Sequence, residues 1–446
     1  MAVNSIDVED LVDRQAFTAF TLRVLVLALL ALIADGFDVQ VMSFAAPSLM
    51  KAWHLQRAAF APVFSASLFG ILFGAPLFGW IGDHIGRKTC IVLSSITYGL
   101  LSLACLTARD LNTLTLLRFL TGVGLGGVMP NAIAIAAELA PRRLRAGMAS
   151  VISAGITIGG IAPGLIVAQA PPGETWKLLF LVGGTAPLAI AALIALAMPE
   201  SLGFLVQRGV ARARIARLVR DLSPGADIGP GTVFMAPPRP ATEPVGLRAL
   251  FAGELAVITP LLWVMFAATL LSIYMLTSWM PLLLEASGFS GQQAATTNSM
   301  FQAGGVIGCV VVSLLLGRFG ARLVATLFVL CLVAVGVVAR ADLPQAFLAF
   351  AIAACGFCLV GAQAALNSTA GLAYPTPVRA RGLGMALGVG RIGSVIGPLL
   401  GGAMVASGVT SARDLFLLPI IPLALGALAT WAVMGRLNAR ASGPIP

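Results

Sequence analysis

Asp35 and Asp38 are acidic residues inside an apolar run near the start of the chain, in the sequence Asp35-Gly-Phe-Asp38. A charged carboxylate within hydrocarbon costs about 3 kcal/mol, so both residues need a partner or a chemical role. Three positions apart on a helix, they share one face, where mutual repulsion and desolvation favour the neutral form of at least one. The pair therefore predicts a site that binds and releases protons, with a fixed structural ion pair as the alternative.

Arg118 and Arg391 also lie deep inside apolar runs. If successive runs cross a membrane in alternating directions, Arg118 reaches the depth of the two aspartates, and an ion pair there would lower the burial penalty. Protonation of the aspartate would release Arg118 to attract an anion or to reset a gate. Arg391 has no acidic residue at its depth in its own half, and a guanidinium grips a carboxylate through paired hydrogen bonds. We therefore predict that Arg391 and Arg118 contact an anionic substrate.

Most of the chain is apolar. Of its 446 residues, 59% are hydrophobic and 10% are charged, whereas about 25% are charged in an ordinary soluble domain. Apolar runs of about 20 residues recur from end to end, each long enough to cross a hydrocarbon core as a helix. The runs lack the alternation of a membrane barrel. The sequence predicts an all-α membrane protein with twelve transmembrane helices, at residues 21–47, 60–80, 90–107, 113–137, 147–168, 177–198, 255–284, 294–316, 322–340, 345–372, 383–406 and 414–435.

The predicted helices form two sets of six on either side of a polar stretch. The second set echoes the first, because Gly147-Met-Ala149 returns as Gly384-Met-Ala386 at the same place in its set. A duplicated unit predicts two pseudo-symmetric six-helix bundles around a cavity that opens to each side in turn. We expect an N-terminal tail at 1–20, an N-terminal bundle at 21–198, a linker at 199–250, a C-terminal bundle at 251–436 and a C-terminal tail at 437–446.

Basic residues are distributed unequally between the two ends of the predicted helices. The end that holds both termini and the linker carries 19 Lys and Arg residues, and the other end carries six. The positive-inside rule places the richer end in the cytoplasm. The segment Met1 to Thr18 is acidic, unlike the start of a cleavable signal peptide. Because arginine far outnumbers lysine, as in GC-rich bacterial genomes, we expect a multi-pass protein of a bacterial plasma (inner) membrane, with cytoplasmic N- and C-termini.

Other chemistries lack their sequence signatures. The glycine-rich segment at 122–127 has no preceding strand and no following acidic residue, as a dinucleotide site requires, and no phosphate-binding loop occurs. His54 and His84 fall in predicted loops and form no metal cluster. Basic residues sit between apolar runs instead of along one face. We expect no catalytic residues or enzyme activity, no metal, no cofactor and no nucleic acid partner. The expected partners are a small substrate, protons and the lipid bilayer. We expect the chain to function as a monomer.

Several spaced motifs resemble those of one family. The segment Gly79-Trp-Ile-Gly-Asp83-His-Ile-Gly-Arg87-Lys88 is similar to the signature loop of the major facilitator superfamily, and Arg118-Phe-Leu-Thr-Gly-Val-Gly124 is similar to its fourth-span motif. Within that superfamily, Asp35-Gly-Phe-Asp38 resembles the first-span motif of the aromatic acid:proton symporters, the 4-hydroxybenzoate and benzoate type. The stretch from Met129 to Glu138 and the segment around Arg391 agree with the same family, so the resemblance covers nearly the whole chain.

The resemblance implies a role for each of these charged residues. Asp35 and Asp38 are implied to couple protons, and Arg391 to bind an aromatic carboxylate. The cytoplasmic gate is implied to contain Asp83, Arg87 and Glu138. In the second half, the matching loop has Gly317 where the family often has an aspartate, so the gating role is carried over to the first half alone.

The expected function is secondary active transport by alternating access, with proton-coupled uptake of an aromatic carboxylate of the benzoate and hydroxybenzoate class. A carrier of non-aromatic organic acids or an exporter of amphipathic compounds is the alternative on the same architecture. A membrane receptor without transport is the alternative from another class. Four aromatic residues are candidates for stacking on a substrate ring, namely Phe37, Phe44, Tyr274 and Trp279.

Overall fold

The structure is a computed structural model that describes residues 5–170, 173, 175–223, 228–229, 231–236, 246–340, 344–408 and 412–442, with the backbone alone at 340, 412 and 437–442. Twelve helical stretches of the described residues are long and apolar enough to cross a membrane. They coincide with the twelve predicted spans, which confirms the all-α membrane fold. Parts of the predicted linker and of both predicted tails lie outside the described residues.

The first six spans contain helices α2 to α9. Their bounds are α2 Ala19–Trp53, α3 Ala61–Ile85, α4 Arg87–Ala104, α5 Leu111–Leu125, α6 Val128–Glu138, α7 Arg142–Gly159, α8 Ala162–Gln169 and α9 Thr175–Ala197. The fourth span is α5 followed by α6, and the fifth is α7 followed by α8, each pair meeting at glycines. Short 3-10 turns, at Arg57–Phe60 and Cys105–Thr107, extend the second and third spans.

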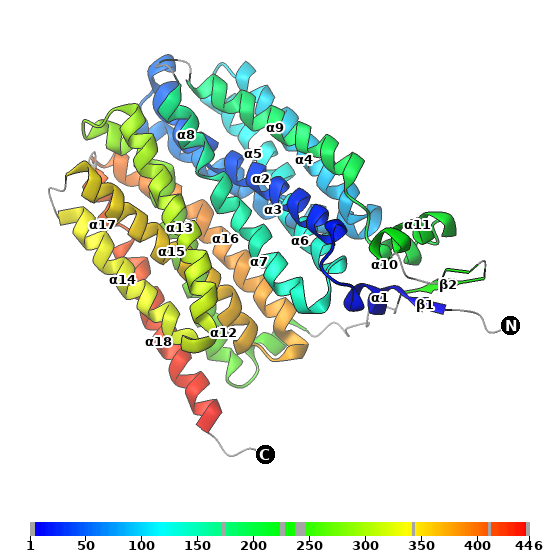
Figure 1. Ribbon diagram of the computed structural model, residues 1–446. Helices are drawn as coiled ribbons and strands as arrows, with labels where there is room; N and C mark the ends of the chain where they lie inside the picture. The colour runs from blue at the N-terminus through cyan, green and yellow to red at the C-terminus, as the bar shows by residue number, and fades with distance from the viewer. Residues whose placement is uncertain are drawn as a thin grey trace.

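The last six spans contain helices α12 to α18. Their bounds are α12 Leu255–Ala286, α13 Gly291–Phe319, α14 Ala321–Arg340, α15 Gln345–Ala373, α16 Thr376–Ala406, α17 Ala412–Leu417 and α18 Ile420–Ser442. Helix α13 begins with a capping box, in which the side chains of Ser290 and Gln293 each bind the other residue's backbone N–H. The spans of both sets run side by side as a bundle (Figure 1).

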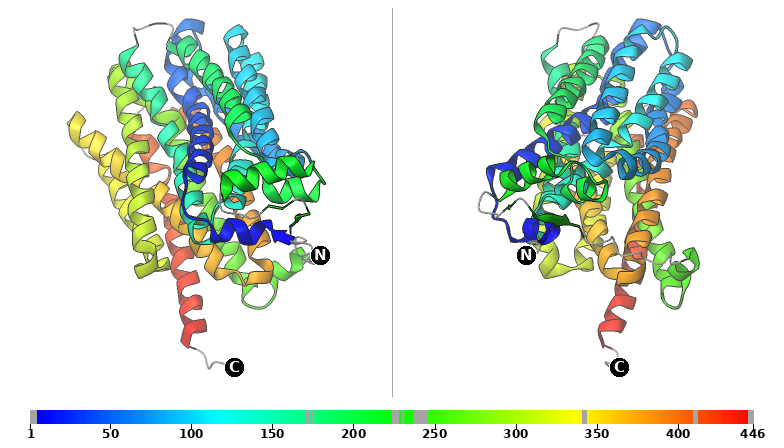
Figure 2. Two further views of the ribbon diagram at one scale, coloured as in Figure 1. Left: turned by 45° about the vertical axis from the view of Figure 1, so that its right-hand side comes forward. Right: turned by 90° about the vertical axis from the view of Figure 1, so that its right-hand side faces the viewer.

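A small layer outside the spans joins the N-terminal segment to the linker. Strand β1 (Ser5–Asp7) pairs in parallel with β2 (Val233–Met235), and α1 (Val8–Arg14), α10 (Leu202–Gln207) and α11 (Arg212–Leu222) lie beside them. We call this end of the bundle, where β1 and the end of α18 both lie, the linker side (Figure 2). A 3-10 turn at Leu247–Phe251 leads from the linker into α12. The sequence did not predict this pair of strands.

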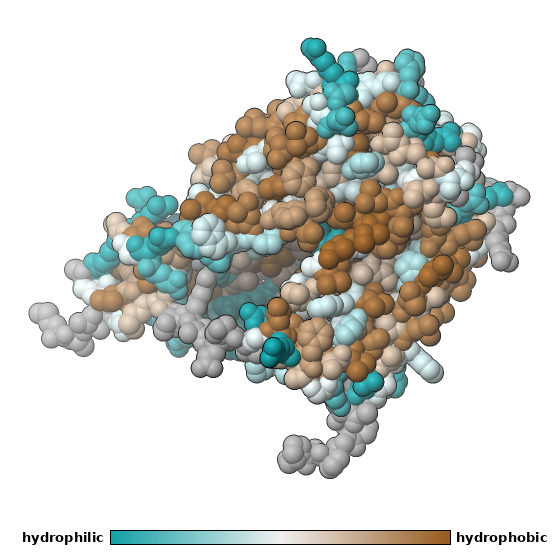
Figure 3. Space-filling model, turned by 180° about the vertical axis from the view of Figure 1, so that it is seen from behind, coloured by the Kyte–Doolittle hydropathy of each residue, from teal (hydrophilic) through white to brown (hydrophobic). Residues whose placement is uncertain are grey.

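The surface matches a chain that lies in lipid. Large apolar side chains are exposed on many spans, among them Leu196, Leu314, Phe350 and Trp431. A broad band of apolar residues covers the middle of the face in Figure 3, and hydrophilic residues gather toward its ends. Since water would penalise so large an apolar surface, its natural solvent is hydrocarbon.

Candidate functional site

Asp38 and Arg118 form an ion pair inside the first six spans. Nη2 of Arg118 lies 2.9 Å from Oδ2 of Asp38, and Nη1 donates to Oδ1 over 3.2 Å. Nη2 also donates to the backbone carbonyl of Asp38, and Ser102 of α4 donates to Oδ1 over 3.0 Å. Both charged side chains are sealed from solvent, and the ring of Phe180 lies 5.9 Å from the guanidinium. The expected partnership between the first and fourth spans is therefore present.

Asp35 faces a different environment from Asp38. It makes no hydrogen bond or ion pair among the described residues, and its side chain lines a cavity. Residues three apart on a helix point about 60° from each other, which suffices here to direct Asp38 into the bundle and Asp35 toward the cavity. The sequence placed both carboxylates beside Arg118, but only Asp38 pairs with it.

The cavity that Asp35 lines has a volume of about 430 Å³. Cavities of about 300–1,000 Å³ hold small organic ligands. Arg391, at the middle of α16, and Tyr274 of α12 face the same cavity from the second half. Most of the remaining lining is apolar, from α3, α5, α6, α7 and α16. One cationic and one acidic side chain thus lie within an apolar chamber between the two halves.

Arg391 makes no ion pair with a carboxylate in the part of the chain that the structure describes. Its guanidinium is therefore available to a ligand in this conformation. Arg118, the other predicted substrate contact, does not line the cavity and is paired with Asp38. A direct contact between Arg118 and a substrate requires that ion pair to open.

The four candidate stacking residues fall into two groups. Tyr274 lines the cavity, so it stays a candidate for stacking on a substrate ring. Trp279 is fully buried, donates to the carbonyl of Pro398 over 2.9 Å, and packs edge-on against Phe64. Phe37 and Phe44 are likewise buried in helix packing. Packing explains these three rings, which do not line the cavity.

The two halves meet closely on the side opposite the linker. Lys51 at the end of α2 pairs with Glu285 at the end of α12 over 2.6 Å. Ser65 of α3 donates to the carbonyl of Val395 in α16 over 2.8 Å. At Gly402 of α16, an added Cβ would lie 2.2 Å from the Cβ of a residue in α3. These contacts close the opposite side, whereas the cavity is lined by the middle of α3, by α6 and by the linker-side half of α16.

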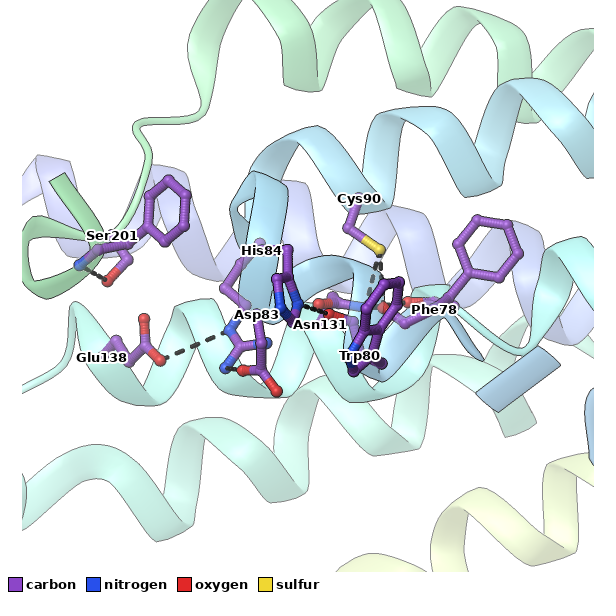
Figure 4. A network of polar contacts seen from close by, with 11 residues as sticks. Phe78, Trp80, Asp83, His84, Cys90, Asn131, Glu138 and Ser201 are labelled. Atoms are coloured by element: carbon purple, nitrogen blue, oxygen red, sulfur yellow. Dashed lines mark hydrogen bonds and ion pairs between the residues drawn. The ribbon is translucent and has the colours of Figure 1, made fainter. Parts of the chain in front are cut away.

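The predicted gate residues Asp83, Arg87 and Glu138 lie at the linker-side ends of α3, α4 and α6, and Figure 4 labels two of them, Asp83 and Glu138. The guanidinium of Arg87 contacts the carboxylate of Asp83, and its Nε lies 3.7 Å from Oε1 of Glu138. Gly86 makes the turn between α3 and α4 with a φ of 100°, a backbone conformation that suits glycine. The structure therefore brings Asp83, Arg87 and Glu138 together.

Two polar residues near the site, Ser102 and Tyr98 of α4, were not identified from the sequence. Ser102 hydrogen-bonds Asp38, and Tyr98 is fully buried one turn before it. The signal that points to them is a row of polar residues at a spacing of about four in an otherwise apolar span, which places them on one helix face. Among the described residues, no group of three His, Cys, Asp or Glu side chains is placed to hold a metal ion.

Comparison with known proteins bears on this arrangement. A family model described as "Major Facilitator Superfamily" matches residues 28–376. A gallate transporter from Pseudomonas putida is 38% identical over 431 residues, which cover 96% of this chain and 95% of that protein. The 4-hydroxybenzoate transporter PcaK from Pseudomonas aeruginosa is 34% identical, covering 97% and 96%, and the benzoate transport protein from Acinetobacter baylyi is 30% identical, covering 97% and 93%. The resemblance to transporters of this group is confirmed.

Solved structures share the fold at lower identity. A D-xylose-proton symporter superposes with a TM-score of 0.72 at 14% identity, covering 93% of this chain and 97% of that one. A bacterial homolog of the human lysosomal transporter Spinster, in an inward-facing and unoccupied conformation, superposes with a TM-score of 0.71 at 18% identity, covering 94% and 98%. Each likeness covers at least 93% of this chain, and it shows the fold.

Proposed function

The chain belongs to the major facilitator superfamily, and from that premise we propose that it takes up an aromatic carboxylate of the benzoate and hydroxybenzoate class together with protons. The observation that carries the proposal is the central cavity, where Arg391 and Asp35 face an apolar chamber of about 430 Å³. A monocarboxylate on a small ring matches that chamber in charge, polarity and size. The names of the relatives, which refer to gallate, 4-hydroxybenzoate and benzoate, support the same substrate class.

Electrostatics within the cavity couples substrate to proton. Arg391 attracts a carboxylate, while an ionised Asp35 lining the same chamber repels it. A proton on Asp35 removes the repulsion, so substrate and proton favour each other's binding. A symporter requires this mutual preference, because a carrier that holds only one of its two ligands must not change its access from one side of the membrane to the other.

Asp38 and Arg118 form the second part of the coupling site. Their ion pair is stable while Asp38 is ionised, and protonation of Asp38 removes the charge that compensates Arg118. An uncompensated guanidinium within the bundle favours a rearrangement that gives it a new anionic partner. We infer that this rearrangement accompanies the change of access from one side to the other.

Alternating access is proposed to proceed by rocking of the bundles at 21–198 and 251–436 about the cavity. The contacts on the opposite side, such as Lys51 with Glu285, would part as the linker side closes. On closure, Asp83 and Arg87 would meet the neighbouring half and complete the gate, with Glu138 holding Arg87 in place. The excess of basic residues orients the linker side toward the cytoplasm of a bacterial cell, with both termini on that side. The transporting unit is proposed to be a monomer.

Uptake into liposomes tests the proposal. Purified protein is reconstituted, an inward proton gradient is imposed, and accumulation of radiolabelled 4-hydroxybenzoate is measured for wild type and Asp38→Asn. Gradient-driven accumulation that is lost in the variant and abolished by an uncoupler supports proton symport. Wild-type vesicles that bind the acid yet never accumulate it would instead favour a receptor.

Competition distinguishes the remaining alternative. Unlabelled benzoates should reduce uptake at low concentration, whereas aliphatic acids of the same charge should compete poorly, because the apolar chamber gains less from a chain than from a ring. Equal competition by aliphatic acids would point to a general organic acid carrier. Efflux without uptake would point to an exporter.

A further inference from the structure

Tyr98 is a buried phenol with no assigned partner. Its side chain has no exposed surface, and its hydroxyl lies near that of Ser95, one turn earlier on α4, without a hydrogen bond of normal geometry among the described residues. Leaving a hydroxyl buried without a hydrogen bond costs about 1–3 kcal/mol. Such a group at the centre of a bundle calls for a functional explanation.

The position of Tyr98 on α4 places it level with one of the two carboxylates of α2. Ser102 hydrogen-bonds Asp38, so these two residues lie level on neighbouring helices. Helices α2 and α4 both run away from the linker side. One turn back along α4 is Tyr98, and one turn back along α2 is Asp35, so these two also lie level. Tyr98 is therefore at the level of Asp35 and one turn from the level of Asp38.

Close packing fixes the start of the Tyr98 side chain. At Gly124 of α5, an added Cβ would lie 3.0 Å from the backbone N and 3.1 Å from the Cβ of Tyr98, so α4 and α5 are in close contact there. The Cβ of Tyr98 is therefore held beside α5, and rotation about the side-chain bonds decides where the hydroxyl lies.

Asp38 itself has no route to solvent in this conformation. Its side chain has no exposed surface and does not line the cavity, whereas Asp35 lines the cavity directly. A proton that arrives through the cavity therefore reaches Asp35 first, and it needs an intermediate group to reach Asp38. A hydroxyl between the two carboxylates can serve, because it both donates and accepts.

We propose that Tyr98 is the hydroxyl link that passes protons between Asp35 at the cavity and the sealed Asp38–Arg118 pair. Once the side chain of Tyr98 has turned so that its hydroxyl bridges both carboxylates, the protonated carboxyl of Asp35 gives its proton to the Tyr98 oxygen while the phenol's own proton moves to the carboxylate of Asp38. Asp35 is left ionised, Asp38 becomes neutral, and the phenol is neutral before and after. The reverse transfer resets the site.

This inference rests on the proposed proton-coupled transport. Within the helices that pack on α4, the charged groups away from the helix ends are Asp35 and Asp38 on α2 and Arg118 on α5. Arg391 of α16 lines the same cavity as Asp35. The other charged residues of the helices that pack on α4 lie at helix ends, namely Arg23, Lys51, Asp83, His84, Glu138 and Lys177, as do Arg87 and Lys88 of α4 itself. A pH response of transport that depends on the phenol can therefore be traced to the two aspartates.

Tyr98→Phe tests the link because it removes the hydroxyl and keeps the ring. In proteoliposomes, counterflow exchange of 4-hydroxybenzoate is measured at equal pH, and net uptake with proton entry is measured under an inward gradient with a trapped pH indicator. We expect Tyr98→Phe to keep exchange and to slow gradient-driven uptake by at least about tenfold, since a positioned proton-transfer group commonly contributes more than that. The pH profile of net uptake should shift as well.

Tyr374→Phe is the matched control, because Tyr374 is also fully buried, with its hydroxyl near that of a single residue, Thr259, but lies in the second half. It should leave both activities unchanged, and neither variant should unfold at a lower temperature than wild type, because each change removes a buried hydroxyl and keeps the ring. Net uptake by Tyr98→Phe at the wild-type rate, or equal loss of exchange and uptake, would overturn the link. Absence of gradient-driven uptake in wild type would instead overturn the proposed function, and the link with it.

Discussion

The guanidinium of Arg118 lies 2.9 Å from the carboxylate of Asp38, and the two side chains are 1% and 0% exposed. The two residues come from the fourth and first spans and belong to the same six-helix set. An ion pair this deeply buried contributes little net stability, but removal of one member leaves the other without compensation. The pair therefore responds strongly to any change in the charge of Asp38.

Arg118→Gln should destabilise the protein because it leaves Asp38 buried without its cation. The expected loss is about 3–5 kcal/mol of unfolding free energy, measured by thermal or denaturant unfolding in detergent. Asp38→Asn in the same chain should recover part of that loss, since the second change removes the orphaned charge. If the two changes add independently, the pair is not coupled. Full proton-driven uptake by Arg118→Ala would contradict the role of Arg118 in the transport cycle.

Arg391 should determine substrate affinity. Hydrogen bonds to charged groups contribute about 1.5–3 kcal/mol each, and about 1.4 kcal/mol corresponds to a tenfold change in affinity. Arg391→Lys keeps the charge but not the paired geometry, so KM for 4-hydroxybenzoate should rise by about tenfold, and Arg391→Gln should raise it further. Arg248→Lys, an exposed exchange in the turn before α12, is the control. Unchanged KM in Arg391→Gln would remove Arg391 from the binding site.

The spans and one half of the site could be predicted from the sequence. Long apolar runs determine the helices, and matched depth in antiparallel spans predicted the contact of Asp38 with Arg118. The separate environment of Asp35 could not be predicted, because a rotation of about 60° on α2 decides which carboxylate faces the cavity. The pairing of β1 with β2 was also beyond prediction, since each strand has three residues and they lie far apart in the chain.

The ion pair between Lys51 and Glu285 should bias the protein toward the conformation that is closed opposite the linker. The Lys51 side chain is 67% exposed, so solvent screens the pair and its contribution is at most about 1 kcal/mol. Lys51→Glu, which adds repulsion, should make the opposite side open more often. A cysteine at Ser299, which is buried in that closed interface, should then react faster with a membrane-impermeant maleimide added from that side.

Exchange of the two charges is the control for this prediction about the Lys51–Glu285 ion pair. Lys51→Glu combined with Glu285→Lys restores an opposite pair at the same place, and it should return the labelling rate of Ser299→Cys toward the value without either change. If the labelling rate is the same with the original pair, with Lys51→Glu alone and with the exchanged pair, apolar packing alone keeps this side closed.

Gly122 of α5 should tolerate no side chain. An added Cβ there would lie 2.0 Å from the backbone carbonyl oxygen of Ser67 in α3, and a backbone atom cannot move without displacing its helix. We expect Gly122→Ala to lower the unfolding free energy by about 1–3 kcal/mol or more, as overpacking does in well-packed cores. Because α5 carries Arg118, the displacement should also weaken the ion pair with Asp38 and reduce transport.

Gly371→Ala is the matched change in an open position, because an added Cβ in that part of α15 meets nothing within 4 Å. Alanine restricts the unfolded chain more than glycine, so this variant should be stabilised by about 0.4–1 kcal/mol. Both unfolding midpoints can be measured in one detergent, beside uptake of 4-hydroxybenzoate. Equal and small effects at the two positions would mean that α3 and α5 are not in close contact, and the geometry that presents Arg118 to Asp38 would then have to be different.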